Sequence, residues 1–280
     1  MARPTLLARL FRQPPARPGD SYGAPGQGSS LAISAVTVVA LLFLWWLVTA
    51  LGLMKPLFLP APQAVLQRFV RVMNEGFGGA TLWQHTAASL ARVFGAFVLA
   101  AALAIPVGIG MGINRILRGV FDPPIEFYRP LPPLAYLPLT IIWFGIDELQ
   151  KIVLLFLAMF APIVLSTRAG VRSVAIEQIH AAYSMGASRA QVVAHVILPA
   201  ALPEIITGLR IGIGVGWTTL VAAEMVAATA GLGFMVLSAA EFLVTEVVIL
   251  GIVMIGVVAY LFDLFLRWME RVLVPWKGKT

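Results

Sequence analysis

Long uncharged apolar runs are the feature that most constrains how this chain folds. The first, from Leu31 to Leu53, reads LAISAVTVVALLFLWWLVTALGL and contains no charged residue. At about 1.5 Å per helical residue, such a run can cross a hydrocarbon core of about 30 Å. Further spans are predicted at about 88–113, 124–145, 151–170, 204–228 and 245–267. The sequence therefore predicts an all-α integral membrane protein with six transmembrane helices.

The composition argues against several classes of function. Hydrophobic residues make up 60% of the chain and charged residues 12%, whereas soluble domains carry about 25% charged residues. There is no cysteine, and the three histidines are far apart in the sequence. The terminal Gly-Lys-Thr lacks the earlier glycine and the following helix of a phosphate-binding loop. We therefore expect no catalytic residues, no bound metal and no cofactor, with any ATP bound by a partner.

The placement of lysine and arginine predicts the orientation in the membrane. Most basic residues lie before residue 31, after residue 266 and in the predicted loops at 114–123 and 171–204. Because cytoplasmic segments are rich in Lys and Arg, both termini are predicted to be cytoplasmic. The predicted regions are a flexible basic tail (1–30), a six-span domain (31–270) with a cytoplasmic loop (171–204), and a C-terminal tail (271–280). The net charge of +7 therefore does not indicate nucleic acid.

Some of the spans carry local patterns that predict helix contacts. The third span has six prolines between Pro123 and Pro138, and a broken helix at membrane depth must be buried in protein or line a cavity. Small residues recur every fourth position in the second and fifth spans: Ala100, Ala104, Gly108 and Gly112, then Gly208, Gly212 and Gly216. Such stripes allow close helix packing, although ordinary use of glycine in membrane helices is the alternative. Within residues 56–79, helical spacing of apolar residues predicts a short amphipathic helix.

Ionisable residues at membrane depth are candidates for the translocation path. Glu224 in the fifth span is spaced by seven residues from Trp217 and again from Arg210, which places them on one face of a helix with Thr218 nearby. The alternatives are an interhelical hydrogen bond for Glu224, packing for Trp217 and an interfacial anchor for Arg210. Two further path candidates lie in or near the Pro-rich span: Tyr136 and Arg129.

The polar loop at 171–204 predicts two short helices. The first ends near Gly186, which is free to adopt positive φ. Ser188 and Gln191 form a capping box that begins the second helix, and Pro199 is expected to end it. Between the helices lies an elbow of small residues: Ala181, Ala182, Gly186 and Ala187. Such an elbow can enter a groove on a partner; the alternative is an amphipathic surface loop without one.

This loop resembles the signature of ABC importer permeases, which reads Glu-Ala-Ala, three residues, Gly, nine residues and Ile-x-Leu-Pro. Here it stands as His180-Ala181-Ala182, Gly186 and Val196-Ile197-Leu198-Pro199. His180 replaces the acidic residue, which affects any salt bridge to the ATPase, and Val196 replaces isoleucine. Stretches such as LFLPAPQAVL and YRPLPPLAYLPLTIIWFGI resemble the nitrate, sulfonate and taurine branch, and GLGFMVLSAAEFL and VPWKG resemble taurine-type permeases.

The resemblance implies a type I ABC importer permease in a bacterial cytoplasmic (inner) membrane. It implies a homodimer with two cytoplasmic ATPase subunits, and an extracytoplasmic binding protein that docks on segments 54–87, 146–150 and 229–244. The implied substrate is taurine or a related aliphatic sulfonate, with nitrate or a vitamin precursor as alternatives. A stand-alone secondary transporter and an intramembrane enzyme are the competing classes. The implied ATPase-coupling residues are His180, Ala181, Ala182, Gly186, Ala187, Ser188 and Pro199.

Overall fold

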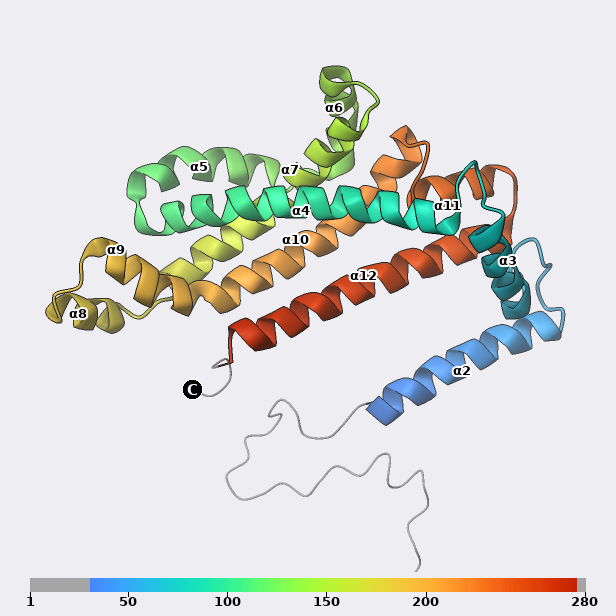
Figure 1. Ribbon diagram of the computed structural model, residues 1–280, viewed down its shortest axis with the longest axis horizontal. Coiled ribbons are helices and arrows are strands. Elements are labelled where there is room, and N and C mark those ends of the chain that lie inside the picture. The colour runs from blue at the N-terminus through green and yellow to red at the C-terminus, as the bar shows by residue number, and fades with distance from the viewer. Residues whose placement is uncertain (1–30, 276–280) are drawn as a thin grey trace, which may run out of the picture. The chain divides into compact units, whose positions relative to one another are not determined.

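A computed structural model describes residues 31–275 of the chain, and its regular elements are helices (Figure 1). The one bridge between extended residues in this range joins Phe77 and Ala80. The predicted tail at 1–30 and the last five residues of the predicted tail at 271–280 lie outside the described range. The chain divides into two compact units, Met1–Leu66 and Gln67–Thr280.

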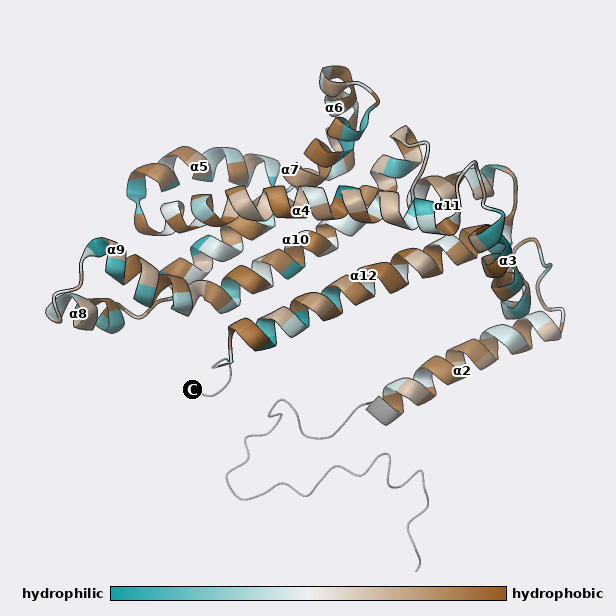
Figure 2. Cartoon of the chain, in the orientation of Figure 1, coloured by the Kyte–Doolittle hydropathy of each residue, from teal (hydrophilic) through white to brown (hydrophobic). Residues whose placement is uncertain are grey.

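The helices alternate between long apolar elements and short ones. Within residues 31–275, five helical stretches are long and apolar enough to cross a membrane: Ile33–Ala50, Leu82–Ile113, Glu148–Arg172, Arg189–Ala227 and Thr245–Leu273. Their surfaces are rich in apolar residues (Figure 2). The elements are α2 (Leu31–Ala50), α3 (Pro62–Asn74), α4 (Leu82–Ile113), α5 (Arg115–Tyr128), η1 (Pro133–Ala135), α6 (Leu137–Phe144), α7 (Glu148–Arg172), α8 (Ile176–Ser184), α9 (Arg189–Val192), η2 (Val193–Ile197), α10 (Leu198–Ala227), α11 (Leu232–Glu241) and α12 (Thr245–Leu273). The predicted all-helical membrane fold is confirmed.

The third predicted span, 124–145, is not one continuous helix. α5 ends at Tyr128, a 3-10 turn covers Pro133–Ala135, and α6 runs only from Leu137 to Phe144. Pro132 has an extended backbone before the 3-10 turn, and proline can neither donate a backbone hydrogen bond nor fit inside a regular helix without a kink. The prolines therefore divide this segment into pieces that are each too short to cross a bilayer alone. α4 and α7 run parallel, with Arg92 bonded to Glu148 near their starts and Gly108 beside Thr167 near their ends, so the pieces together return the chain to the side where α4 begins.

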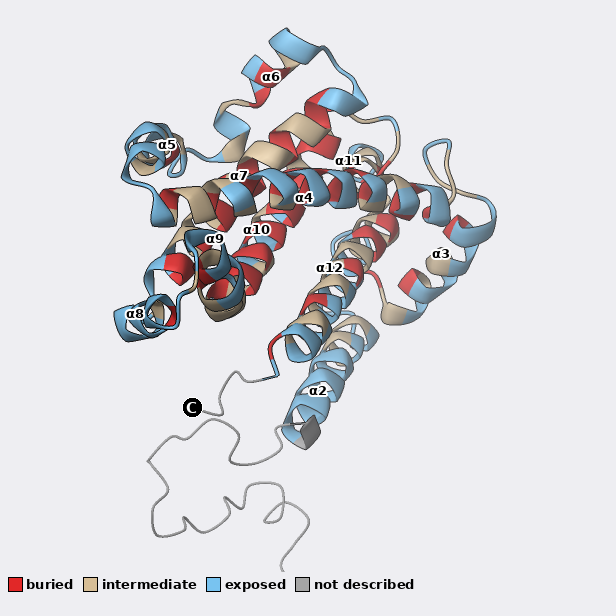
Figure 3. Cartoon of the chain, turned by 60° about the vertical axis from the view of Figure 1, so that its left-hand side comes forward, coloured by how far each residue is buried: buried red, intermediate tan, exposed pale blue. Residues whose placement is uncertain are grey.

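α7 lies between α4 and α10 and forms the centre of the second unit. A Cβ added to Gly208 would lie 2.5 Å from the Ser166 Cβ, and one added to Gly212 would lie 2.8 Å from the Ile163 Cγ1. On the other side of α7, a Cβ at Gly108 would lie 2.6 Å from the Thr167 Cβ. The predicted small-residue faces are confirmed as contact faces: in lipid such residues let helix backbones approach closely. Buried residues concentrate along these contacts (Figure 3).

Candidate functional site

The predicted small-residue elbow is present between α8 and α9, at one end of the α4–α7–α10 layer (Figure 1). Gly186 has a φ of +84°, a conformation that L side chains rarely adopt. Ser188 accepts a hydrogen bond from the Gln191 backbone, and the Gln191 side chain accepts one from the Ser188 backbone. The predicted turn and capping box are therefore both confirmed.

The exposed surface of the elbow is largely small or apolar. His180, Ala181, Gly186 and Ser188 are exposed, Ala187 is half-buried, and Ala182 is buried against the core. Met185, which was not predicted as a coupling residue, is 82% exposed. A large apolar side chain beside an open glycine is a surface that a partner protein can cover.

Pro199 does not end the second helix of the loop, contrary to the prediction. Residues Val193–Ile197 form a π-helical turn, and the Leu198 N–H donates to the carbonyl of Val193, five residues earlier. Pro199 then occupies the first turn of α10, directly after the π-turn. The π-turn therefore links the elbow to a transmembrane helix through continuous helical backbone.

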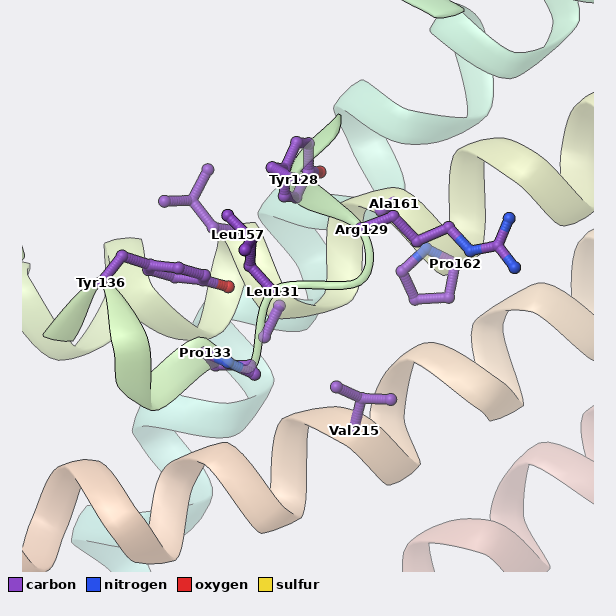
Figure 4. A pocket seen from close by; sticks show the side chains of 10 residues that line it. Tyr128, Arg129, Leu131, Pro133, Tyr136, Leu157, Ala161, Pro162 and Val215 are labelled. Carbon is purple, nitrogen blue, oxygen red and sulfur yellow. The ribbon is translucent and has the colours of Figure 1, made fainter. Parts of the chain in front are cut away.

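A cavity of about 200 Å³ lies where the broken third segment meets α7 and α10 (Figure 4). Its wall brings together two of the predicted path candidates, Tyr136 and Arg129. Tyr128, which the sequence argument did not name, lies in the same wall. The other lining residues are apolar: Leu131, Pro133, Leu157, Ala158, Ala161, Pro162 and Val215.

The polar groups of this cavity are hydrogen-bond donors. Arg129 is 57% exposed and forms an ion pair with Glu126 on the preceding helical turn, with 3.4 Å between Nη1 and Oε2. The buried Tyr128 hydroxyl lies near the Ala161 backbone but makes no hydrogen bond of good geometry among residues 31–275. In Figure 4 the Tyr136 ring reaches across toward Leu131, and Arg129 extends past Pro162. The cavity can therefore offer donors to an anion.

Glu224, a further predicted path candidate, lies in a buried ion cluster. Its side chain is 0% exposed, and its Oε1 accepts a hydrogen bond of 2.7 Å from Arg92 Nη1 on α4. The Ser89 hydroxyl donates to Oε1 over 2.8 Å, and the Gly233 N–H donates to Oε2 over 2.8 Å. Arg92 is not among the residues predicted from the sequence, although a lone arginine within an apolar span predicts a carboxylate partner on another helix.

The cluster extends to the ends of two neighbouring helices. Arg92 also donates to both carboxylate oxygens of Glu148, the first residue of α7, over 2.6 and 2.7 Å. Lys151 Nζ lies 2.9 Å from Glu148 Oε1. Arg92 Nη1 further donates to the Ala230 carbonyl over 2.6 Å. One guanidinium group thus joins α4, α7, α10 and the loop that precedes α11.

The other predicted path candidates on α10 do not share one environment. Trp217 is 6% exposed, and its indole nitrogen has no hydrogen-bond partner in the described part of the chain. Thr218 is exposed and donates to the Val215 carbonyl over 2.8 Å. Trp217 and Thr218 therefore lie on different faces of α10, while Val215 lines the cavity at the broken segment.

Comparison with known proteins identifies the family. Residues 104–276 match the family described as "Binding-protein-dependent transport system inner membrane component", which is more than half of the chain. The chain belongs to this family. It is an ABC importer permease, and the elbow described above lies within the matched residues. Within residues 31–275, no group of three His, Asp or Glu residues is placed to hold a metal ion.

The relatives narrow the branch of the family to which this permease belongs. It is 57% identical to the "Taurine transport system permease protein TauC" of Escherichia coli (strain K12), over 89% of this chain and 91% of the relative. It is 34% identical to the "Putative aliphatic sulfonates transport permease protein SsuC" of Bacillus subtilis (strain 168), over 98% of this chain and 95% of the relative. The resemblance to taurine-type permeases is confirmed.

Solved structures support the fold. The permease superposes on a chain of the MetNI methionine ABC transporter in inward-facing conformations with a TM-score of 0.59 and 22% sequence identity. The alignment covers 69% of this chain and 95% of that chain. At this identity the likeness concerns the fold alone, and the fold is that of a type I importer permease.

Proposed function

We infer that this permease carries taurine, or a related aliphatic sulfonate, across the bacterial inner membrane into the cytoplasm. The observation that supports this most strongly is the 57% identity to a taurine permease over 89% of the chain. The chain is a transport subunit of an ABC importer, and the energy for transport comes from ATP hydrolysed on separate subunits.

The elbow between α8 and α9 is the contact for the ATPase. Gly186 leaves open space, since an added Cβ would meet nothing within 4 Å, and Met185 beside it presents an apolar side chain. Two ATPase subunits each receive one elbow from a homodimer of the permease. Because the π-turn joins the elbow to α10, a displacement of the elbow moves α10 as well.

The opposite end of the long helices receives the substrate. Segments 146–150 and 229–244 lie at the far ends of α7, α10 and α12 from the elbow, and an extracytoplasmic binding protein delivers substrate there. The basic residues near the elbow, such as Arg172 and Arg189, support a cytoplasmic location for it. Both termini are then cytoplasmic.

Reconstitution of the complete transporter tests this function. Liposomes containing the permease and its ATPase subunits are supplied with binding protein, ATP and either taurine, an alkanesulfonate or nitrate. Uptake and ATP hydrolysis are both expected to rise with taurine or the alkanesulfonate and not with nitrate. Stimulation by nitrate alone contradicts the substrate assignment. Full-speed transport by the permease without ATPase subunits contradicts the whole proposal.

A further inference from the structure

The cavity at the broken third segment has the chemistry of an anion site. Three of its lining side chains carry hydrogen-bond donors, namely Tyr128, Arg129 and Tyr136, and none of its lining residues carries a carboxylate. Its volume of about 200 Å³ is room for several water molecules at about 30 Å³ each. A sulfonate group presents three acceptor oxygens, so a site with three donor side chains and no carboxylate matches it.

The irregular backbone around the cavity also indicates a binding site at membrane depth. The chain between α5 and α6 is irregular over residues 129–132, within a segment predicted to lie at membrane depth. Irregular backbone at that depth persists only where it is buried in protein or lines a water-filled cavity. The wall formed by Leu157, Ala161 and Pro162 of α7 and Val215 of α10 places this cavity among the long helices that cross the membrane.

The ion pair between Arg129 and Glu126 can separate at little cost in free energy. Its side chains are 57% and 50% exposed and its closest atoms are 3.4 Å apart, and an exposed ion pair of this kind contributes little free energy. If Arg129 turns toward a sulfonate in the cavity, Glu126 loses its partner, and its carboxylate can then bind another cation. A zwitterion that carries both a sulfonate and an ammonium group replaces both halves of the pair.

We propose that this cavity is a transit site for a small zwitterionic sulfonate, which exchanges partners with the Arg129–Glu126 pair. Arg129 and the Tyr128 hydroxyl bind the sulfonate, and Glu126 binds the ammonium group. This proposal rests on the proposed function, and it names the protein groups that would contact the substrate during transport. Since the pair re-forms when the substrate leaves, the site releases its cargo without leaving an unpaired charge behind.

The buried Tyr128 hydroxyl is a second observation that supports a sulfonate site in the cavity. It makes no hydrogen bond of good geometry in the described residues, and a buried polar group without a good partner is costly. An arriving sulfonate oxygen supplies that partner. Replacement of Tyr128 by phenylalanine therefore removes a contact with substrate and, within the protein, only the approach of the hydroxyl to the Ala161 backbone.

The test uses the complete transporter in liposomes with ATPase subunits and loaded binding protein. Taurine and an alkanesulfonate without an amine are each supplied at a concentration that saturates the binding protein. Arg129→Gln is expected to lower the uptake rate of both by at least about tenfold, the effect of losing one charged hydrogen bond, and Arg129→Lys by less. Glu126→Gln is expected to lower taurine uptake and leave uptake of the amine-free sulfonate unchanged.

Tyr128→Phe is expected to slow uptake of both substrates severalfold. Tyr260→Phe, at an exposed tyrosine on α12, is the control and is expected to change neither rate.

Two results overturn the transit site. Unchanged uptake of both substrates by Arg129→Gln shows that the cavity does not bind the sulfonate. An equal fall in the uptake of both substrates in Glu126→Gln shows that the ion pair stabilises the protein and does not bind the ammonium group. In either case a wild-type complex that takes up taurine leaves the proposed function intact, whereas a wild-type complex that takes up no sulfonate overturns both proposals.

Discussion

Arg92 on α4 and Glu224 on α10 form a buried ion pair, with 2.7 Å between Nη1 and Oε1. The side chains are 7% and 0% exposed. Around them the Ser89 hydroxyl, the Gly233 N–H and the Ala230 carbonyl complete the hydrogen bonding. A pair so fully satisfied fixes the ends of several helices to one another, because each charge would be left unpaired in a dry interior if the helices separated.

Glu224→Gln is therefore expected to destabilise the permease. Removal of one partner of a buried ion pair costs about 3–5 kcal/mol. Because Arg92 keeps Glu148 and the Ala230 carbonyl as partners, the lower part of that range applies. The free energy of unfolding, measured in lipid–detergent micelles with denaturant, checks this. Glu148→Gln is the matched control, and since Glu148 is 54% exposed its loss is expected to cost about 1 kcal/mol.

The same variant tests the prediction that Glu224 lines the translocation path. A transporter that folds with wild-type stability but takes up substrate slowly would support the path role and contradict the structural one. A transporter with lower stability and normal uptake per folded complex would support the structural role. Uptake is therefore normalised to the amount of assembled complex.

Gly231→Ala is expected to disturb the ion cluster more than other glycine substitutions do. Gly231 has a φ of +142°, and a Cβ there would lie 2.4–2.5 Å from the carboxylate atoms of Glu224. Overpacking of this kind costs about 1–3 kcal/mol, in addition to the backbone strain. Gly79→Ala is the control, because Gly79 also has positive φ but nothing within 4 Å of an added Cβ. Equal losses of thermal stability in the two variants would show that the contact with Glu224 is unimportant.

Gly186→Trp is expected to abolish co-purification of the ATPase subunits while the membrane domain stays folded. The space around Gly186 is open, so the indole ring projects from the elbow and blocks a partner's approach. Gly186→Asn is the control, because asparagine tolerates positive φ and adds little bulk. Affinity purification of the complex and the melting temperature of the permease are both measured. Normal recovery of ATPase with the tryptophan variant would exclude the elbow as the docking surface.

Gly208→Ala is expected to weaken the contact between α10 and α7. The added Cβ would lie 2.5 Å from the Ser166 Cβ, which is held close to the backbone and cannot swing away, so the helices must separate at a cost of about 1–3 kcal/mol. Gly214→Ala is the control on the same helix, with nothing within 4 Å. It is expected to leave stability unchanged or to raise it, by up to about 1 kcal/mol of helix propensity. If Gly214→Ala lowered the melting temperature more than Gly208→Ala, the proposed packing of α10 on α7 would be contradicted.

Local patterns in the sequence predicted the features that depend on neighbouring residues. Long apolar runs predicted the long helices, the Ser188–Gln191 spacing predicted a capping box, and Gly186 predicted the turn of the elbow. Each of these depends on hydrophobicity or on hydrogen bonds within a few residues. Pro199 was assigned wrongly because a π-turn accommodated it in the first turn of α10, and local propensity does not include that option.

Tertiary structure alone decided which distant groups meet. Glu224 was recognised as an ionisable residue at depth, but its partner Arg92 lies 132 residues earlier in the chain, and no local pattern selects it. Tyr136 and Arg129 were both named as path candidates, but only the packing of the broken segment against α7 and α10 places them with Tyr128 in the wall of one cavity. The physical reason is that a buried charge or an unpaired donor needs a partner from another helix, and the packing of those helices determines which partner is within reach.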